Sequence, residues 1–292
     1  MALLGSMTSP AIQQLFAAWG AWLRSFGYLK RENLRAYHLV GPGAIVSLSC
    51  LGWLFSTRLN AAVQSALHWV LALAGLDSDT HSAETPEFWS NALSWGVSHL
   101  EWLLHWGVMA IVFWIKVKIM KYLLLTMTAP FMGLLSAAIR TKETGQSTPF
   151  SVSGFLHDVF RGFRAAFVLF VLEMSLTLAL AVSGLLLTVF ASPLALVLSP
   201  VLFVMSWTVG SYFYGAAVFD VVFEQEGLDW KRSIRRGWQQ KGHLTGIGMV
   251  FSLLLAIPIF GTYMAAILGP IPCAAAASTL TFQSSLPAEN PS

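Results

Sequence analysis

Residues 174–219 form a stretch of 46 residues that contains no Asp, Glu, Lys or Arg. As a helix this stretch would be roughly 69 Å long, at about 1.5 Å per residue, whereas the hydrocarbon core of a bilayer is about 30 Å thick. It is therefore long enough for two crossings, and Ser192-Pro193 or Ser199-Pro200 offers a turn between them. We expect a helical hairpin over residues 165–219, although its length permits full crossing without requiring it.

The composition extends this expectation to the whole chain. Hydrophobic residues make up 56% of it and charged residues only 11%, and the mean hydropathy is +0.66. A soluble domain carries roughly 25% charged residues, so the chain has too few charges to cover a surface that faces water. This deficit argues against a soluble enzyme, a disordered protein or a nucleic-acid-binding protein. We predict an all-α integral membrane protein with about four spanning helices plus helical hairpins that enter the bilayer partway.

Two further spans and one surface helix are expected before residue 120. Residues 36–58 and 95–115 are long enough to span, and Pro42, between two glycines, should kink or open the first of them. Residues 10–27 place apolar side chains at helical spacing, with Trp19 and Trp22 among them. Such a stripe fits an interfacial helix, because indole rings favour the headgroup level, but a helix facing a protein core would show it too.

The few charges are grouped by sign, which predicts the topology. Residues 58–101 contain one Arg and five acidic residues, residues 116–164 contain seven Lys or Arg and two acidic residues, and residues 224–243 contain five and three. Cytoplasmic loops are enriched in Lys and Arg. The basic zones are therefore placed inside, with 224–243 as a basic cytoplasmic segment, and an even number of crossings must separate them.

This topology predicts two helical segments that enter the membrane and return. Residues 122–139 have basic groups on both sides, so we predict a re-entrant hairpin that folds at Pro130. Residues 245–286 are interrupted by Pro258 and by further Gly and Pro residues, and we predict a hairpin of broken helices there. Both termini would then be cytoplasmic.

The start of the first span is a candidate anion site. Asn33 is a suitable helix N-cap, and Lys30, Arg31 and Arg35 lie beside it. The N–H groups at a helix N-terminus, together with nearby cations, suit oxyanions such as sulfate. The same basic residues could instead only orient the chain in the membrane.

Glu173 is the only formal charge in residues 165–219, and a carboxylate at membrane depth usually faces a cavity or a partner. It could line a transport pathway, or lie near the membrane surface. Glu101, His99 and His105 lack a recognisable metal-ligand spacing and fit an interfacial band better. No nucleophile motif, phosphate-binding loop or zinc motif occurs in the sequence. We therefore expect that the protein is not an enzyme and that it binds no cofactor and no metal ion.

A series of short motifs extends over about residues 15–285. Their order and spacing resemble those of the CysZ-like family, which includes the etoposide-induced membrane proteins. They are Lys121-Tyr122-Leu123, Ala129-Pro130-Phe131, residues 150–163 with their Arg-Gly pair, Ser233-Ile234-Arg235-Arg236, Gly246-x-Gly248 and Ile257-Pro258-x-x-Gly261.

The bacterial members of this family are sulfate transporters with long helices and partly inserted hairpins. The resemblance implies that this chain transports sulfate or a related oxyanion across a bacterial inner membrane and assembles as a homo-oligomer. The family's Gly-Leu-Arg-Arg sulfate-binding stretch corresponds here to Asn33, Leu34, Arg35 and Ala36, so two of its four residues are replaced. Pro42, Pro130 and Pro258 would interrupt helices and expose backbone groups along the path. The alternatives are a non-transporting membrane scaffold and, with less support, a lipid enzyme.

Overall fold

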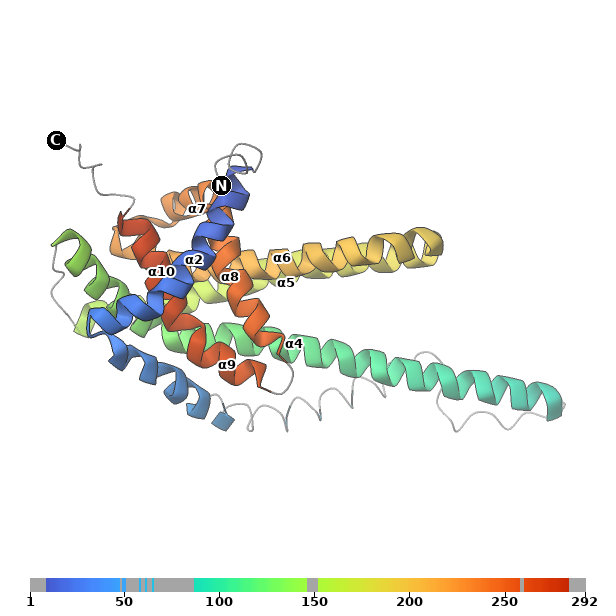
Figure 1. Cartoon of the computed structure of the whole chain (residues 1–292). Helices are drawn as coiled ribbons and strands as arrows, with labels where there is room; N and C mark the ends of the chain where they lie inside the picture. The colour runs from blue at the N-terminus through green and yellow to red at the C-terminus, as the bar shows by residue number, and fades with distance from the viewer. Residues whose placement is uncertain are drawn as a thin grey trace. The chain divides into compact units, whose positions relative to one another are not determined.

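The computed structural model describes residues 9–47, 49–50, 58, 61, 65, 87–145, 152–257 and 260–283, without the side chains of residues 87–113, 115–116, 152–159, 192 and 230. Its named elements are α2 (Pro10–Arg31), the 3-10 helix η1 (Arg35–Leu39), α4 (Glu87–Thr144), α5 (Val152–Phe190), α6 (Ser192–Gln225), α7 (Trp230–Gln239), α8 (Lys241–Leu255), α9 (Gly261–Leu268) and α10 (Pro270–Gln283). Figure 1 shows these helices, and the described residues contain no strand. The predicted all-α class is confirmed.

The chain divides into two compact units, residues 47–121 and the remainder. Within the smaller unit, Lys118 Nζ lies 5.5 Å from the centre of the Trp114 ring. The larger unit contains α2, η1, the part of α4 from Tyr122 onward and all of α5 to α10. Every contact discussed below belongs to this larger unit.

Four helical segments are long and apolar enough to cross a membrane: Val117–Thr144, Phe160–Phe190, Pro193–Gln225 and Gly261–Gln283. Of the two spans predicted near the N-terminus, most of residues 48–58 and the side chains of 95–113 lie outside the described residues. The four segments fit the predicted membrane protein.

Helices α5 and α6 pack along each other and are joined at Ala191, beside the first of the two turn sites considered from the sequence (Figure 1). Pro193 lies in the first turn of α6, where a missing N–H is tolerated. Pro200, at the second turn site, is inside α6. The helix therefore continues through the second site.

The structure corrects the hairpin that we expected at Pro130, because α4 runs unbroken through this residue. A proline inside a membrane helix is tolerated where neighbouring helices support the backbone. Here the Gly162 position of α5 faces Ala129, and the Gly133 position faces Val221 of α6. Neighbouring helices therefore lie in contact with α4 on both sides of the proline in sequence, at Ala129 and at Gly133.

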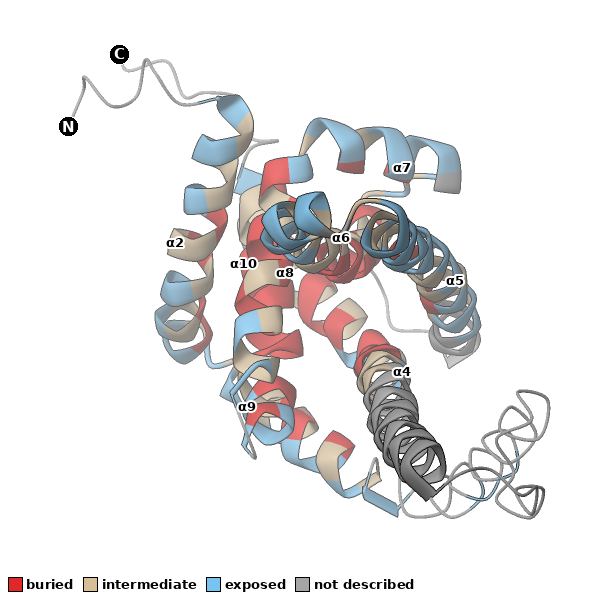
Figure 2. Cartoon of the chain, turned by 90° about the vertical axis from the view of Figure 1, so that its right-hand side faces the viewer, coloured by how far each residue is buried: buried red, intermediate tan, exposed pale blue. Residues whose placement is uncertain are grey.

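The chain between residues 241 and 283 does form broken helices. Helix α8 ends at Leu255, α9 begins at Gly261, and Gly269 separates α9 from α10. Pro258 itself lies outside the described residues. Helix α10 is buried along most of its length, as the red ribbon in Figure 2 shows.

Glycines bring α8 close to two other helices. A Cβ atom at Gly248 would overlap the backbone of Ser211 in α6, and one at Gly215 of α6 would overlap the backbone of Leu244. On another side of α8, a Cβ atom at Gly246 would lie 2.8 Å from the Cβ of Ala18 in α2. Small residues at such crossings let helix backbones approach in the absence of a hydrophobic driving force.

The face of α2 that is buried in the protein differs from the apolar stripe seen in the sequence. Its buried residues are Ala18, Ala21, Ser25 and Leu29. Three large residues of the stripe are exposed, namely Ile12, Phe16 and Leu23. The two tryptophans lie between these faces, where Trp19 Nε1 donates to the Gly246 carbonyl at 3.0 Å and Trp22 Nε1 donates to the Leu268 carbonyl at 3.2 Å.

Candidate functional site

The candidate anion motif lies where α2 ends. Asn33 has φ +58°, in the left-handed region, and the N–H of Leu34 donates to the Leu29 carbonyl at 2.9 Å. The N–H of Asn33 also reaches the Lys30 carbonyl at 3.5 Å. This pair of bonds is a Schellman motif, in which Asn is one of the few residues besides Gly that adopt the left-handed position readily.

Asn33 therefore closes α2 instead of capping the next helix, which corrects the role assigned to it from the sequence. Leu34 is the N-cap of η1, and no side chain caps that helix. Asparagine is common in both positions, so composition alone could not distinguish them. Asn33 and Arg35 are exposed in this turn, and Leu34 is half-buried.

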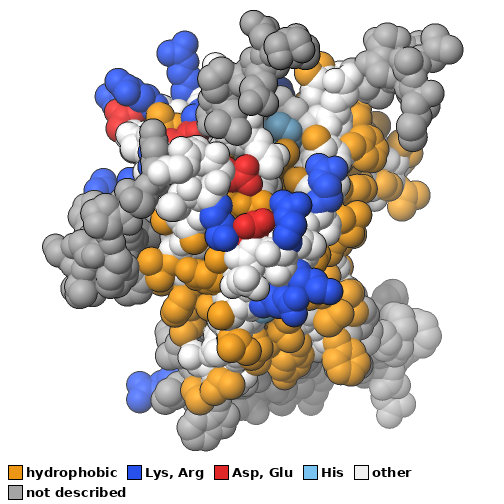
Figure 3. Space-filling view, turned by 60° about the vertical axis from the view of Figure 1, so that its left-hand side comes forward, with side chains coloured by type: hydrophobic (Ala, Val, Ile, Leu, Met, Phe, Trp, Pro, Cys, Tyr) orange, Lys and Arg blue, Asp and Glu red, His pale blue; other side chains and the backbone are white. Residues whose placement is uncertain are grey.

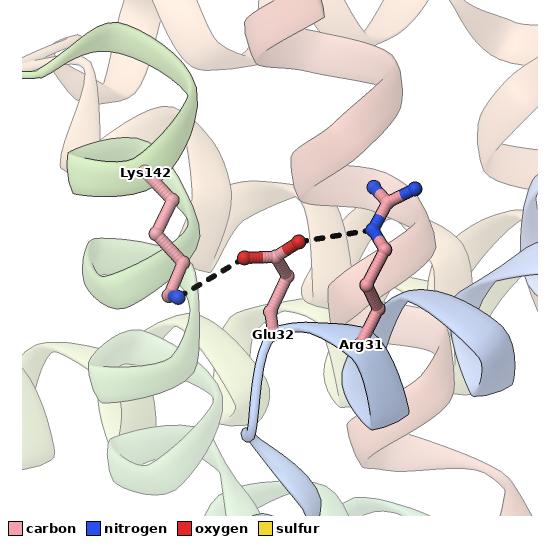
Figure 4. Close-up of polar contacts among 3 residues, drawn as sticks. All are labelled: Arg31, Glu32 and Lys142. Atoms are coloured by element: carbon pink, nitrogen blue, oxygen red, sulfur yellow. Dashed lines mark hydrogen bonds and ion pairs between the residues drawn. The ribbon is translucent and has the colours of Figure 1, made fainter.

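A carboxylate occupies the cationic end of α2. Glu32 Oε1 lies 3.0 Å from Arg31 Nε, and Glu32 Oε2 lies 3.0 Å from Lys142 Nζ at the end of α4 (Figure 4). Arg31 also lies over the Tyr28 ring, with its Cζ 5.7 Å from the ring centre. The two oxygens of one carboxylate thus bridge cations that are 111 residues apart in the sequence.

Electrostatics at this cluster follow from these contacts. The hydrogen bonds from Lys142 and from Arg31 hold the pKa of Glu32 below its usual value. Burial raises the pKa of Tyr28, and the nearby charge of Glu143 adds to this shift. Glu32 is therefore an anion and Tyr28 is neutral at physiological pH. Figure 3 shows one face of the molecule on which acidic side chains lie between Lys and Arg side chains.

Sequence reasoning missed Lys142. It was counted only as one of several basic residues that mark the cytoplasmic side, and nothing in the local sequence connects it to α2. Its contribution depends on α4 continuing through Pro130, which the sequence did not predict. The only sequence signal was the sign of its charge.

Glu173 lies elsewhere, buried between α5 and α4. Its side chain is fully buried, and Tyr122 Oη donates to its Oε2 at 2.5 Å. Phe170, one turn earlier on α5, packs edge-on against the Tyr122 ring. This arrangement is in keeping with the expectation that a carboxylate at membrane depth faces a cavity or a partner, since Tyr122 is such a partner. Glu173 is buried in the helix packing, whereas Arg35 is exposed, so the two differ in access to solvent.

The three prolines singled out from the sequence have different surroundings. Pro42 is exposed, and residues 40–47 are helical, so the helix is not opened there. Pro130 borders a small cavity with room for about one water molecule, which Asp220 and Glu224 of α6 also line. Arg161 Nη1 pairs with Glu224 Oε1 at 2.9 Å. Pro258 lies outside the described residues.

The basic segment 224–243 contains the amphipathic helix α7. Asp229 caps this helix by accepting from the Arg232 N–H at 3.0 Å. Arg236 is ion-paired with Glu226. Burial raises the pKa of Glu226, although the charges of Arg236 and Arg140 oppose that shift. Ile234 and Trp238, one turn apart, are both more than half exposed.

No group of three or more His, Cys, Asp or Glu side chains that could hold a metal ion occurs in the described part of the chain. His99, Glu101 and His105 are outside it, because their side chains are not described. The arrangement at the end of α2 is instead suited to a small anion, since it combines a fixed turn with exposed cations.

The four long apolar helical segments of the described residues indicate a multi-pass helical membrane protein. A family model described as "Sulfate transporter CysZ/Etoposide-induced protein 2.4" matches residues 21–264. The match covers most of the chain and includes the candidate anion motif. The chain belongs to this family, and the resemblance seen in its sequence motifs is confirmed. A search of curated proteins found no match.

Proposed function

We propose that this protein transports sulfate or a related small oxyanion across a bacterial inner membrane, with both termini in the cytoplasm. One observation carries the proposal, the family match to residues 21–264, which includes the end of α2. The resemblance of the sequence motifs implies that residues 33–36 take the place of the family's sulfate-binding stretch, of which Leu34 and Arg35 are retained. The four long apolar helical segments among the described residues are in keeping with the proposal.

The chemistry of capture follows from charge and exposure. Arg35 is exposed and planar, with several N–H donors that match the geometry of an oxyanion. Lys30 and Arg31 raise the local positive potential, which concentrates anions at the turn. The family's second Arg is Ala36 here, so we expect weaker binding than a turn with two adjacent arginines would give. Glu173 and the breaks between α8, α9 and α10 are candidates for the path beyond the turn, and a homo-oligomer would complete the transporter.

The test is labelled-sulfate flux into liposomes that contain the purified full-length chain. We expect flux above that of empty liposomes, and Arg35→Ala should reduce it by about tenfold, the effect of roughly 1.4 kcal/mol in anion binding. Arg232→Ala is the matched control, since Arg232 is exposed on α7 and should be neutral. Absence of flux under every imposed gradient would overturn the proposal.

A non-transporting membrane scaffold is the second candidate, and one observation favours it. Large apolar side chains on the α5–α6 hairpin are exposed, including Phe190, Leu196 and Phe203. A hairpin covered with such residues could organise lipid or partner helices without moving a solute. Normal membrane insertion, crosslinked partner proteins and no anion binding would support the scaffold over the transporter.

A further inference from the structure

The ion pairs at the end of α2 suggest more than an anion-binding turn. A carboxylate with each of its oxygens on a different cation presents the same pattern that an oxyanion would present to those cations. Glu32 does this with Arg31 and Lys142, at 3.0 Å on both sides (Figure 4). It immediately precedes Asn33, so the bridging carboxylate belongs to the same turn as the candidate motif.

We propose that Glu32 is a tethered competitor of the transported oxyanion, and that Lys142 and Arg31 form a second half of the anion site. This inference rests on the proposed transport function and adds a residue from α4 to it. An incoming oxyanion replaces the Glu32 carboxylate on the two cations, and the carboxylate returns when the anion leaves. The cations therefore keep a partner in both states.

Accessibility supports this exchange. The Arg31 side chain is 76% exposed and that of Lys142 is 41% exposed, so an anion in solution can reach both. Ion pairs at such a surface are weak, because water and salt screen them. The pair can open without disturbing the fold, since the turn is held by backbone bonds from Asn33 and Leu34.

The local charge balance also fits a dianion. The turn contributes Lys30, Arg31 and Arg35 as cations and Glu32 as an anion; α4 contributes Lys142 and Glu143, and Tyr28 is neutral. Four cations and two carboxylates leave a net charge of +2. One sulfate would neutralise the cluster, whereas a monovalent anion would neutralise half of it.

The experiment is equilibrium binding of labelled sulfate to the purified full-length chain, with chloride competition as a second arm. Glu32→Gln removes the competing charge and keeps the shape of the side chain. We expect sulfate to bind about three- to tenfold more tightly, because a dianion loses a like-charged neighbour a few ångströms away. The affinity for a monovalent anion should rise only by about the square root of that factor, because the Coulomb energy of the anion scales with its charge. Lys142→Gln should weaken sulfate binding by a comparable factor.

Matched controls are available on α7. Asp229→Asn makes the same charge change as Glu32→Gln and retains the helix cap, since Asn caps as well as Asp. Lys231→Gln makes the same change as Lys142→Gln at another exposed position. Both controls should alter sulfate binding by less than about twofold, because their charges are surrounded by water.

The outcomes separate this inference from the function on which it rests. If Glu32→Gln and Lys142→Gln behave like their controls while Arg35→Ala weakens binding by about tenfold or more, the pair is only a structural link and the inference is overturned. If neither the wild type nor any variant binds or transports sulfate, the proposed function fails as well. Binding that is weak in the wild type and clear in Glu32→Gln would support both.

Discussion

The α5–α6 hairpin and the C-terminal helices are both apolar enough to span a membrane, yet they differ sharply in burial. In the most apolar windows of Phe160–Phe190 and of Pro193–Gln225, 17% of the residues are buried, against 78% in Gly261–Gln283. Figure 2 shows the same contrast, with α10 largely red and the end of the hairpin largely blue. Hydropathy therefore does not decide which helix faces the protein.

Side-chain size distinguishes the two regions. Helix α10 buries the four alanines of residues 274–277 together with the larger Ile271 and Phe282, whereas the hairpin exposes many leucine, valine and phenylalanine side chains. In a bilayer the lipid tails are as apolar as leucine, so large apolar residues gain little by turning inward. Small residues gain close packing, as they do where α8 crosses α6 and α2.

The largest predicted effect concerns a glycine of the small-residue interior. Gly248→Leu should destabilise the protein by about 3 kcal/mol or more, because the new side chain would overlap the Ser211 backbone and the helices would have to separate. Thermal unfolding of the detergent-purified protein measures this as a large fall in Tm or as loss of the folded fraction.

Gly27→Leu is the matched control, because nothing lies within 4 Å of a Cβ atom built at Gly27 in α2. Replacing a helical glycine by leucine at such an open position should raise stability by about 0.5 kcal/mol. Equal losses at Gly248 and Gly27 would contradict the close helix crossing.

A second prediction addresses Glu173, the carboxylate that α5 buries against α4. Tyr122→Phe removes the hydroxyl that donates to the buried Glu173, so it should cost about 1–3 kcal/mol, the usual penalty when a buried polar group loses a hydrogen-bond partner. The readout is again Tm in detergent. Tyr263→Phe, at an exposed position of α9, should stay within about 0.5 kcal/mol of the wild type.

The sequence was sufficient for the features that depend on composition and length. The charge-free stretch over residues 174–219 predicted paired helices, and the structure joins them at Ala191, beside a predicted turn. The all-α class followed from the shortage of charge. These properties are local or additive along the chain, so they can be recognised before any tertiary contact is known.

Features that depend on neighbouring helices could not be obtained in the same way. We predicted a hairpin at Pro130 because the sequence does not show that α5 and α6 pack against α4 beside this residue. In the structure these contacts lie at Gly162 of α5 and at Gly133 of α4. The stripe on α2 left an interfacial helix and a core-facing helix equally open, and only the tertiary contacts show that Ala18, Ala21, Ser25 and Leu29 are its buried residues. Lys142 joined the candidate site only through the continuous α4, a contact between residues distant in sequence.

A third prediction exchanges the two environments directly. Ala276→Leu enlarges a fully buried alanine of α10 and should cost about 1–3 kcal/mol through overpacking. Leu186→Ala shortens a half-exposed leucine of α5 and should change stability by less than about 0.5 kcal/mol. Chemical stability in a denaturant series would compare them. A larger loss at Leu186 would mean that the hairpin packs against protein that covers this face.

The smallest predicted effect belongs to a third environment, the water-facing ion pairs of Glu32. Because its pKa is lowered in the folded protein, Glu32 contributes stability at pH values above its unfolded pKa, and this contribution is lost as the pH falls through the folded pKa. Wild type and Glu32→Gln should therefore differ slightly in Tm at pH 7 and converge as the solution is acidified below the usual range of a glutamate. The measurement is a series of thermal melts of both proteins across this acidic range, at low and high salt, and the difference should shrink in high salt because exposed charges are screened. A difference that persists unchanged at low pH would show that the amide substitution acts through packing, as it would in the buried interior, and not through charge.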